Sequence, residues 1–413
     1  MYNTHPQNVY IAEWALRDPR AQERLYRLAA GFGHPNPPVL SPAELAEAAD
    51  SHGWTSMWRA RKGQADSGRD PDVVLGAYLL DAEELAKNLE RYPQLRYPML
   101  GGQGMYGLRD SSRSRETDQC ICQTALEIHC AYGCLHACQY CHIGNVLTIA
   151  TNLEALTDTL PRLMAENPST HLWKFDNGTD TICFEPEYGA SELMVNYFAQ
   201  LADDYLLLYT KSDNVDHLLD LDPKGQTLIS WSLAGPRAAE LIEKRAPSMA
   251  ARLDAMHKAQ QAGYHVRARL SPICPIEGWQ DELKTLVEQL FAHCQPELIT
   301  MDILGWMNAR QMQEAIDISL FEPKFRQFVE EQAQLPPGRH KKHLFPHEWR
   351  AEIMRHALKE IRRVSPKTPV SICMETLDMW RDMGDELGMT PDRYACCCGP
   401  DSVPGSERVG LSA

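Results

Sequence analysis

The chain has 413 residues, of which 41 are lysine or arginine and 56 are aspartate or glutamate, giving a formal net charge of −15. With 44% hydrophobic and 23% charged residues, the composition is that of a globular enzyme and excludes a disordered or fibrous chain. The acidic balance argues against non-specific nucleic-acid binding, which needs clustered lysine and arginine. The N-terminus lacks an apolar signal region, and no apolar run approaches the roughly 18 residues of a membrane span. We therefore expect a cytoplasmic protein with no membrane partner.

The first 118 residues carry helical patterns separated by stretches rich in proline and glycine. These patterns cover Ala12–Ala30, Pro42–Ser51 and Asp81–Arg91. Proline and glycine are the strongest local breakers of helices, so they mark the connections between these segments. The region holds no chemical signature, and we expect residues 1–118 to form a helical N-terminal extension packed on the main domain.

From about residue 119, short apolar runs alternate with longer amphipathic segments. The runs expected to be strands are Thr124–His129, His171–Phe175, Tyr205–Tyr209, Thr227–Leu233, His265–Ile273, Leu298–Met301 and Val370–Cys373. The segments expected to be helices are Leu153–Glu166, Ala190–Asp203, Ala238–Ala262, Asp281–Cys294 and Met312–Ile318. Strands and helices at this spacing indicate βαβ units and a parallel sheet.

Six or more such units suit an α/β fold with a full or partial (β/α) barrel, whose active site lies at the C-terminal ends of the strands. We expect residues 119–332 to form this barrel core. The remaining residues, 333–413, hold an irregular segment, the last strand and a cysteine-rich tail, and we expect them to lie on the substrate side.

The 13 cysteines are unevenly distributed, with six inside a window of 22 residues and three consecutive near the C-terminus. A cytoplasmic chain keeps its thiols reduced, so this bunching indicates metal, cluster or thiol chemistry in place of disulfides. Cys294, in an apolar stretch, is the best candidate for an inert buried thiol.

Cys134, Cys138 and Cys141 form a C-x3-C-x2-C motif just after the first strand of the βα series. Four thiolates close a zinc or iron–sulfur site, whereas three on a short loop leave one iron of a cubane cluster open, as a reactive centre requires. The alternative is a zinc knuckle that takes its fourth ligand from Cys130 or Cys122.

With Tyr140 between the last two cysteines, the motif resembles that of the radical S-adenosylmethionine (SAM) superfamily. The resemblance implies a partial (β/α)6-type barrel and a [4Fe–4S] cluster whose open iron chelates the amino and carboxylate groups of SAM. It also implies reductive cleavage of SAM to a carbon radical, an electron donor such as flavodoxin or ferredoxin, and packing of Tyr140 near the adenine.

A string of further motifs resembles the spore photoproduct lyase family. It comprises Tyr209–Leu218, Lys224–Gly225, Ile229–Ser232, Ala262–Val266, Ser271–Ile273, Glu277–Trp279 and Ser371–Glu375. By this resemblance Lys211 would reach the SAM carboxylate and Ser232 would bind SAM from the next strand end, with Ser271 on the strand after that. Gly178 and Asp180 stand where many radical SAM proteins have a Gly-Gly-Glu, so Asp180 could accept a charge-assisted bond from the SAM ammonium.

The sequence also departs from that family. The nearest match to the family's hydrogen-donating cysteine is displaced to Cys183, and His142 stands where a tyrosine is usual. The only dense basic cluster, Arg339–His343, is short, so we favour a small-molecule substrate over DNA. Arg267 and Arg269 alternate on one strand, and we expect one of them to point into the barrel. The alternatives are a DNA repair lyase that reverses a thymine photoproduct and a non-catalytic iron–sulfur or zinc-binding protein.

The C-terminal run of three cysteines is the other unusual feature. Cys396 and Cys398 can face one ligand from an extended segment, and with Cys373 they would form a three-thiolate site. Such a site would bind a second cluster, zinc, or a thiophilic substrate such as trivalent arsenic. A redox or hydrogen-donating role is also open, so we predict Cys183, Cys396 and Cys398 as catalytic residues. The alternative is a reduced, partly disordered tail.

Overall fold

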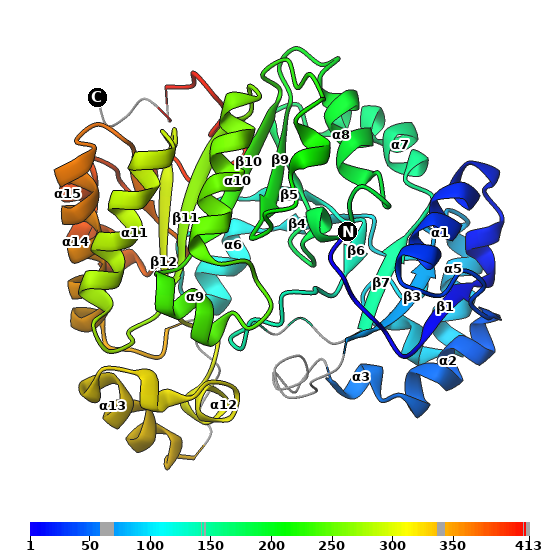
Figure 1. The fold of residues 1–413 in the computed structure, drawn as a ribbon, viewed down its shortest axis with the longest axis horizontal. Coiled ribbons are helices and arrows are strands. Elements are labelled where there is room, and N and C mark those ends of the chain that lie inside the picture. The colour runs from blue at the N-terminus through cyan, green and yellow to red at the C-terminus, as the bar shows by residue number, and fades with distance from the viewer. Residues whose placement is uncertain (58–69, 142, 144–145, 337–342, 408, 410–413) are drawn as a thin grey trace.

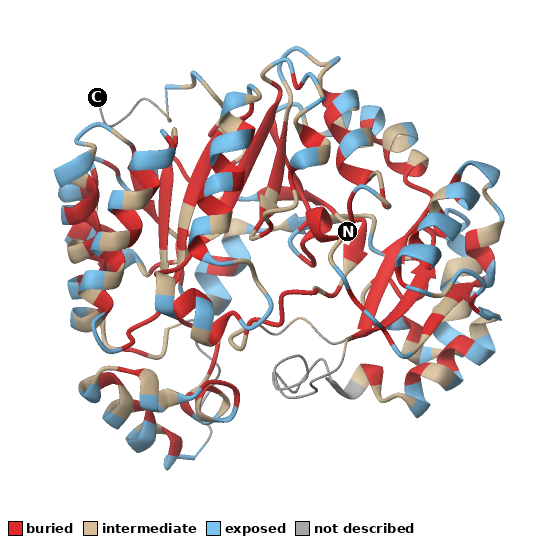
Figure 2. Ribbon diagram, in the orientation of Figure 1, coloured by how far each residue is buried: buried red, intermediate tan, exposed pale blue. Residues whose placement is uncertain are grey.

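The computed structural model describes all residues except 58–69, 142, 144–145, 337–342, 408 and 410–413. His142 and most of the basic cluster Arg339–His343 therefore lie outside the described residues. Two sheets organise the rest of the chain (Figure 1). Most of their strands are buried, whereas the surrounding helices expose one face to solvent (Figure 2).

The smaller sheet belongs mainly to the N-terminal region. Its strand order is β2 (Val39–Leu40), β1 (Val9–Ala12), β3 (Asp72–Gly76), β7 (Val146–Ala150) and β6 (Ala131–Tyr132). All neighbours are parallel except β6 and β7. The helices expected here are present as α1 (Pro19–Gly31), α2 (Pro42–Ser51) and α5 (Ala82–Arg91). A short α3 (Trp54–Met57) follows α2.

The expected helical extension thus also contains a parallel sheet, which the sequence analysis did not predict. Strands β3 and β7 are buried along their whole length. Such strands show no alternation of polar and apolar residues, so periodicity does not identify them. The start of the first predicted helix also differs, since Ala12 ends β1 and Asp18 caps α1 by accepting a bond from the Arg20 amide.

The larger sheet has eight strands in the order β13-β12-β11-β10-β9-β8-β5-β4. Seven of them are parallel neighbours in chain order, and they confirm the predicted strands within a few residues. These are β5 (Ala125–Ile128), β8 (Leu172–Phe175), β9 (Tyr205–Thr210), β10 (Thr227–Leu233), β11 (His265–Ile273), β12 (Ile299–Ile303) and β13 (Val370–Ile372). The antiparallel β4 (Tyr106–Arg109) pairs with β5 at the edge. The expected partial barrel is thus confirmed as a mixed α/β fold.

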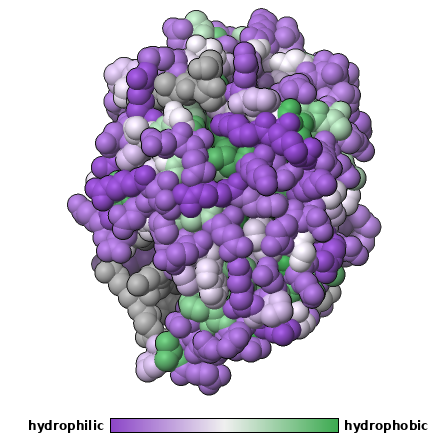
Figure 3. Space-filling view, turned by 90° about the vertical axis from the view of Figure 1, so that its left-hand side faces the viewer, coloured by the Kyte–Doolittle hydropathy of each residue, from purple (hydrophilic) through white to green (hydrophobic). Residues whose placement is uncertain are grey.

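Helices connect these strands. They are α7 (Glu154–Glu166), α8 (Ala190–Phe198), α9 (Pro236–Ile242), α10 (Met249–Gln261), α11 (Trp279–His293), α12 (Ala309–Ala315), α13 (Pro323–Ala333), α14 (His347–Val364) and α15 (Leu377–Leu387), with a three-residue α6 (Ser111–Arg113) after β4. No helix among the described residues is long and apolar enough to span a membrane. The face drawn in Figure 3 is largely hydrophilic, with hydrophobic side chains only in small patches.

One predicted helix, Ala238–Ala262, is two helices in the structure. The chain leaves the helical path after Ile242, and α10 begins at Met249, where the Ser248 side chain caps it by accepting a bond from the Ala251 amide. Pro247 lies in this break, and proline lacks the amide hydrogen that a helix interior needs. The break matters because it carries Glu243, which reaches the candidate site.

The tail after α15 packs against the larger sheet. The Leu172 amide at the start of β8 donates to the Pro400 carbonyl at 3.0 Å, and the Cys397 amide donates to the Thr300 hydroxyl at 3.1 Å. Cys396, Cys397 and Cys398 are all buried. The alternative of a partly disordered tail is therefore wrong for the three consecutive cysteines.

Candidate active site

The cysteine motif lies just after the chain passes from the larger sheet to the smaller one. β5, just before the motif, belongs to the larger sheet, whereas β6 and β7, on either side of the motif, pair in the smaller one. The loop that carries Cys134, Cys138 and Cys141 is therefore the connection between two antiparallel strands. Its three cysteines line a cavity of about 630 Å³.

The same cavity gathers residues from several strand ends of the larger sheet. Besides the three cysteines, its lining includes Tyr140, Asp180, Lys211, Ser232, Arg269, Asp302 and Cys373, and, towards β4 and β5, Arg109, Glu127 and Lys174. Of the residues predicted to contact SAM, Gly178 and Ser271 are not among those lining it. Gly178 precedes the lining residue Thr179, and the Ser271 carbonyl accepts a bond from Lys211 Nζ at 3.4 Å.

Backbone bonds to the break between α9 and α10 shape the cysteine loop. The Gln139 amide donates to the Ile242 carbonyl at 3.0 Å, and the Arg245 amide donates to the His136 carbonyl at 2.9 Å. Cys138 and Glu243 form an isolated antiparallel bridge between these two bonds. The loop conformation thus depends on a segment about 100 residues away in sequence.

Burial keeps the thiols of Cys134 and Cys138 protonated when no metal is bound, because it raises the pKa of both. Burial and the neighbouring Glu243 together raise the pKa of Cys138 to about 12, against the opposing effects of Lys211 and Arg252. A metal or cluster would have to displace these protons, which is the usual coupling between thiolate ligation and proton release. Three thiols on one short loop, with Cys138 buried and Cys134 and Cys141 half-buried, suit a cluster with one open metal position.

Glu243 is a buried carboxylate that the sequence analysis missed. Only 1% of it is exposed, and it receives Arg252 Nη2 at 2.5 Å, Lys211 Nζ at 3.0 Å and the Tyr140 hydroxyl. Burial raises the pKa of its carboxyl, but Lys211 and Arg252 outweigh burial and hold it at about 2. A carboxylate directly before a helix break that contains Pro247 is the one sequence signal that could have found it.

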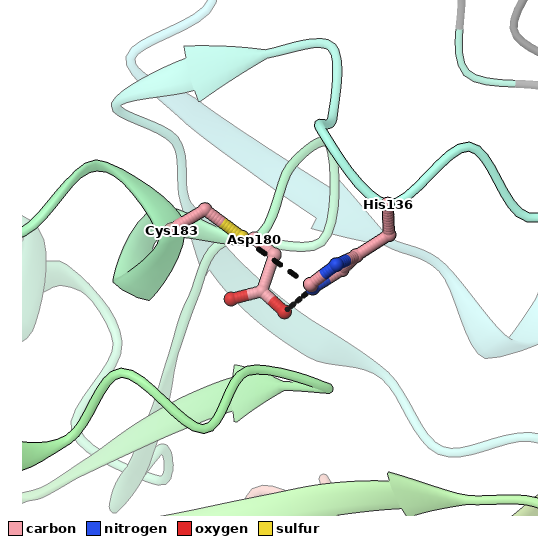
Figure 4. A group of neighbouring side chains, drawn as sticks. All are labelled: His136, Asp180 and Cys183. Atoms are coloured by element: carbon pink, nitrogen blue, oxygen red, sulfur yellow. Dashed lines mark hydrogen bonds and ion pairs between the residues drawn. The ribbon is translucent and has the colours of Figure 1, made fainter. Parts of the chain in front are cut away.

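His136, Asp180 and Cys183 lie behind the loop, and their side chains point toward one another (Figure 4). His136 Nε2 donates to Asp180 at 2.8 Å and lies 3.4 Å from Cys183 Sγ. Asp180 also accepts the Thr210 hydroxyl at 2.8 Å and the Lys211 amide at 2.7 Å. The carboxylate therefore joins the cysteine loop to the ends of β8 and β9. Cys183 is fully buried and is not among the described residues lining the cavity.

Three cations surround Tyr209 at the other end of the cavity. Arg109 and Lys174 both pair with Glu127, at 2.5 and 3.1 Å, while Arg269 contacts the Tyr209 hydroxyl. Lys174 Nζ and the Arg269 guanidinium carbon lie 4.8 and 5.0 Å from the centre of the Tyr209 ring. Burial raises the pKa of Glu127, but Lys174 and Arg109 outweigh it and hold it at about 2. Arg269 thus confirms the expectation that one arginine of β11 points inward, while Arg267 pairs with Glu297.

A second group of thiols adjoins these cations. Cys396 and Cys398 are close enough to interact electrostatically with each other, and Arg109 Nη1 lies 3.7 Å from Cys398 Sγ and 4.0 Å from Cys122 Sγ. Arg269 Nη2 lies 3.7 Å from Cys373 Sγ. The structure therefore brings together the three tail cysteines singled out in the sequence and adds Cys122, which the sequence analysis did not assign to them. We call Cys122, Cys373, Cys396 and Cys398 the tail thiol group.

These features define a class of protein: a partial α/β barrel with a three-cysteine loop over a cavity at its strand ends, as in radical SAM proteins. The sequence profile described as spore photoproduct lyase matches residues 107–372, which is more than half of the chain. The chain therefore belongs to the spore photoproduct lyase family.

Two curated relatives are spore photoproduct lyases. The protein of Bacillus subtilis (strain 168) is 27% identical over 180 residues, which cover 42% of this chain and 52% of the relative. The protein of Geobacillus sp. (strain Y412MC61) is 25% identical over 170 residues, which cover 39% and 49%. The aligned part thus spans about half the length of these relatives.

Solved structures of the same family share the fold over a longer stretch. A cysteine-to-serine variant of spore photoproduct lyase superposes with a TM-score of 0.60 at 18% identity, covering 90% of this chain and 99% of that one. A doubly substituted variant with bound S-adenosylmethionine and dinucleoside spore photoproduct gives a TM-score of 0.55 at 18% identity, with the same coverage. At these identities the likeness concerns the fold.

Proposed function

We propose that the chain is a radical SAM enzyme that holds a [4Fe–4S] cluster on Cys134, Cys138 and Cys141 and binds SAM in the adjoining cavity. The single observation that carries this proposal is the convergence of three loop thiols and Lys211 on one cavity of about 630 Å³. Membership of the spore photoproduct lyase family supports it, as does the solved relative with bound SAM. Once reduced, the cluster would supply the electron that cleaves a C–S bond of SAM to give a carbon radical.

A zinc knuckle has less support because the cysteines that would complete it are engaged elsewhere. Cys130 Sγ lies 3.5 Å from both Asp176 and the Thr181 hydroxyl and is fully buried. Cys122 lies against Arg109 with the tail thiol group. Three loop thiols without a fourth suit a cluster that keeps one iron for a ligand.

The chain's own residues would position SAM. Lys211 would pair with the SAM carboxylate, supported by its place in the cavity wall and its present pairing with Glu243. Tyr140 would pack on the adenine, and its hydroxyl bond to Glu243 would fix the ring. Ser232 lines the same wall, and Ser271 adjoins Lys211. Asp180 would face the SAM ammonium, although its oxygens already accept three groups, so a share of its role is to hold the loop.

The electron would come from a small donor protein such as flavodoxin or ferredoxin in the cytoplasm. All 13 cysteines are free thiols in the structure, which supports a reducing compartment. Oxygen-free, reducing surroundings also suit an exposed low-potential cluster.

For the substrate we propose a small molecule that enters the cavity between the cysteine loop and Cys373. The net charge of −15 supports this choice, because a duplex bound through its phosphates would be repelled. Cys373 favours a thiophilic substrate, for which trivalent arsenic is the test case, with Cys396 and Cys398 behind it. In that role, or as hydrogen-atom donors, Cys396, Cys398 and Cys183 would be catalytic residues. The second candidate is DNA repair, favoured by the relatives' names and by the lesion bound in a solved relative.

One incubation tests the chemistry. The anaerobically reconstituted and reduced enzyme is mixed with SAM, and the fragments are identified by mass spectrometry. 5′-Deoxyadenosine would indicate adenosyl-radical chemistry, and methylthioadenosine would indicate transfer of the aminocarboxypropyl group. If a chain with a full complement of cluster yields neither fragment, the proposal is overturned. Cys294→Ser, which changes a buried thiol beside the Leu253 carbonyl, is the control and should yield the same fragment as the unaltered chain.

The same incubation, repeated with substrates, separates the candidates. Arsenite and UV-irradiated duplex DNA are added separately. Fragment production stimulated by arsenite supports the thiophilic substrate, whereas repair of the irradiated duplex supports the lyase.

A further inference from the structure

We propose that the tail thiol group, Cys122, Cys373, Cys396 and Cys398, is a second metal site in which four thiolates hold a resident soft metal, as zinc or as an iron–sulfur cluster. The proposal goes beyond the radical SAM function. It is an alternative to the arsenic-binding and hydrogen-donor roles proposed above for Cys396 and Cys398, since it assigns these thiols to a resident metal. Four thiolates form a closed site for either metal, whereas the three loop cysteines leave a position open.

The first argument is that distant segments bring these thiols together. Cys122 precedes β5, Cys373 follows β13, and Cys396 and Cys398 lie in the tail. Cys396 is close enough to interact electrostatically with Cys398, and Cys373 is close enough to interact with Cys398 and Cys122. Lone structural cysteines are not drawn together in this way, as the isolated Cys294 illustrates.

The second argument is the direction of the side chains in the tail. Cys396 to Gly399 form a turn, in which the Gly399 amide donates to the Cys396 carbonyl at 3.2 Å. Cys397 turns away from the group, with its Sγ 3.1 Å from the Thr300 hydroxyl and 3.5 Å from the Ala268 carbonyl. Cys396 and Cys398, in contrast, both interact electrostatically with Cys373. Two ligands separated by one residue can serve the same metal.

The third argument is charge. Arg109, Lys174 and Arg269 are buried around the group, and Glu127 pairs with two of them. Among the residues that the structure describes, Arg269 pairs with no carboxylate, and its Nε–H is buried without a hydrogen-bond partner. Asp302, which accepts a bond from Ser271, lies on the same wall. Even when it is counted, these three cations outnumber the two carboxylates named here. Four thiolates around a divalent metal or a [4Fe–4S]2+ core carry two formal negative charges, which these cations would offset.

The fourth argument is access. Of the tail thiol group, Cys373 is among the described residues that line the cavity, and Cys122, Cys396 and Cys398 are not. A substrate ion in the cavity would meet one thiol, whereas a metal behind the wall would meet four. The metal would fasten the tail to β13 and to the loop before β5, and so fix the wall that carries Arg109 and Arg269.

Metal analysis of the whole chain tests this without any substitution. The anaerobically reconstituted protein is assayed for iron, sulfide and zinc. We expect about eight irons per chain for two cubane clusters, or about four irons and one zinc. About four irons with no zinc would overturn the proposal.

A variant isolates the second site. In Cys134→Ala/Cys138→Ala/Cys141→Ala we expect about four irons or one zinc per chain to remain. Adding Cys122→Ser and Cys398→Ser should lower that content at least tenfold, whereas adding Cys294→Ser should leave it unchanged. Two results would overturn the proposal. One is equal metal content in the two extended variants, and the other is a triple variant that takes up arsenite but neither iron nor zinc.

A milder variant guards against misfolding. Cys122→Ser alone, checked by circular dichroism, should release the second metal to a chelator at least tenfold faster than the parent chain. An unchanged release rate would count against the site. Because metal contents and release rates are measured without SAM, these readouts are independent of whether the enzyme cleaves SAM.

Discussion

Lys211 and Glu243 form a buried ion pair, with the ammonium nitrogen 3.0 Å from the carboxylate oxygen. Lys211 follows β9 and Glu243 follows α9, and the same carboxylate binds Arg252 and the Tyr140 hydroxyl. The pair therefore links the lysine proposed for the SAM carboxylate to the aromatic residue beside the cluster cysteines. A substitution of Glu243 should therefore disturb the positions of both Lys211 and Tyr140.

Glu243→Gln should weaken SAM binding and destabilise the chain. Removing one partner of a buried pair leaves Lys211 and Arg252 uncompensated, which costs about 3 kcal/mol. We expect the free energy of unfolding in urea to fall by that amount and the KM for SAM to rise about tenfold, with a smaller change in kcat. Glu240→Gln, on the exposed side of α9, is the matched control. An unchanged KM with reduced stability would mean that Glu243 has only a structural role.

The chain should lose stability in acid. Glu243 and Glu127 both have folded pKa values near 2, below their ordinary value of 4.5. A depressed carboxyl pKa adds stability that is present above 4.5 and is lost as pH falls towards 2. Each carboxylate should contribute about 3 kcal/mol. Urea unfolding of the metal-free chain between pH 7 and pH 3 measures this loss, and Glu127→Gln should reduce the slope. A flat profile would contradict the proposed charge states.

Cys138→Ala should abolish both loop-cluster assembly and SAM cleavage. Each loop cysteine would supply one of three thiolates, so its removal leaves too few ligands for a cubane. Because burial keeps the free thiol protonated, the wild-type chain should release protons when the cluster assembles. Iron content, proton release and SAM fragments are the measurements, and Cys294→Ala should match the wild type in all three. A Cys138→Ala chain that still cleaves SAM would exclude this ligand assignment.

Asp180→Asn should loosen the cysteine loop. The carboxylate accepts His136, the Thr210 hydroxyl and the Lys211 amide, and the amide of asparagine cannot accept all of them equally. Leaving one buried donor unpaired costs about 1–3 kcal/mol. We expect faster loss of iron to a chelator and lower stability in urea. Asp203→Asn, at an exposed position after α8, should change neither. Weaker SAM binding with normal iron retention would instead favour a direct contact between Asp180 and SAM.

Local patterns were enough for the main sheet and for the grouping of the three loop cysteines. Thr227–Leu233 and His265–Ile273 are strands over the predicted bounds, because alternating and apolar runs are set by neighbours in sequence. The cysteine spacing likewise marked Cys134, Cys138 and Cys141, because ligands on one short loop are close together in any fold. The N-terminal sheet escaped prediction because β3 pairs with β7 across some 70 residues, and its buried strands carry no periodic pattern.

What the sequence determined by itself was thus the chemistry that depends on adjacent residues: the thiol loop, the strand–helix alternation and the surplus of acidic groups. Only the tertiary structure decided which distant groups share a site. It paired Glu243 with Lys211, placed Cys183 beside His136 and brought Cys122 close to the tail cysteines. The physical reason is that spacing along the chain limits local geometry, whereas the packing of separate elements selects among many long-range pairings. The charges at this cavity and the tail thiol group beside it come from such long-range pairings.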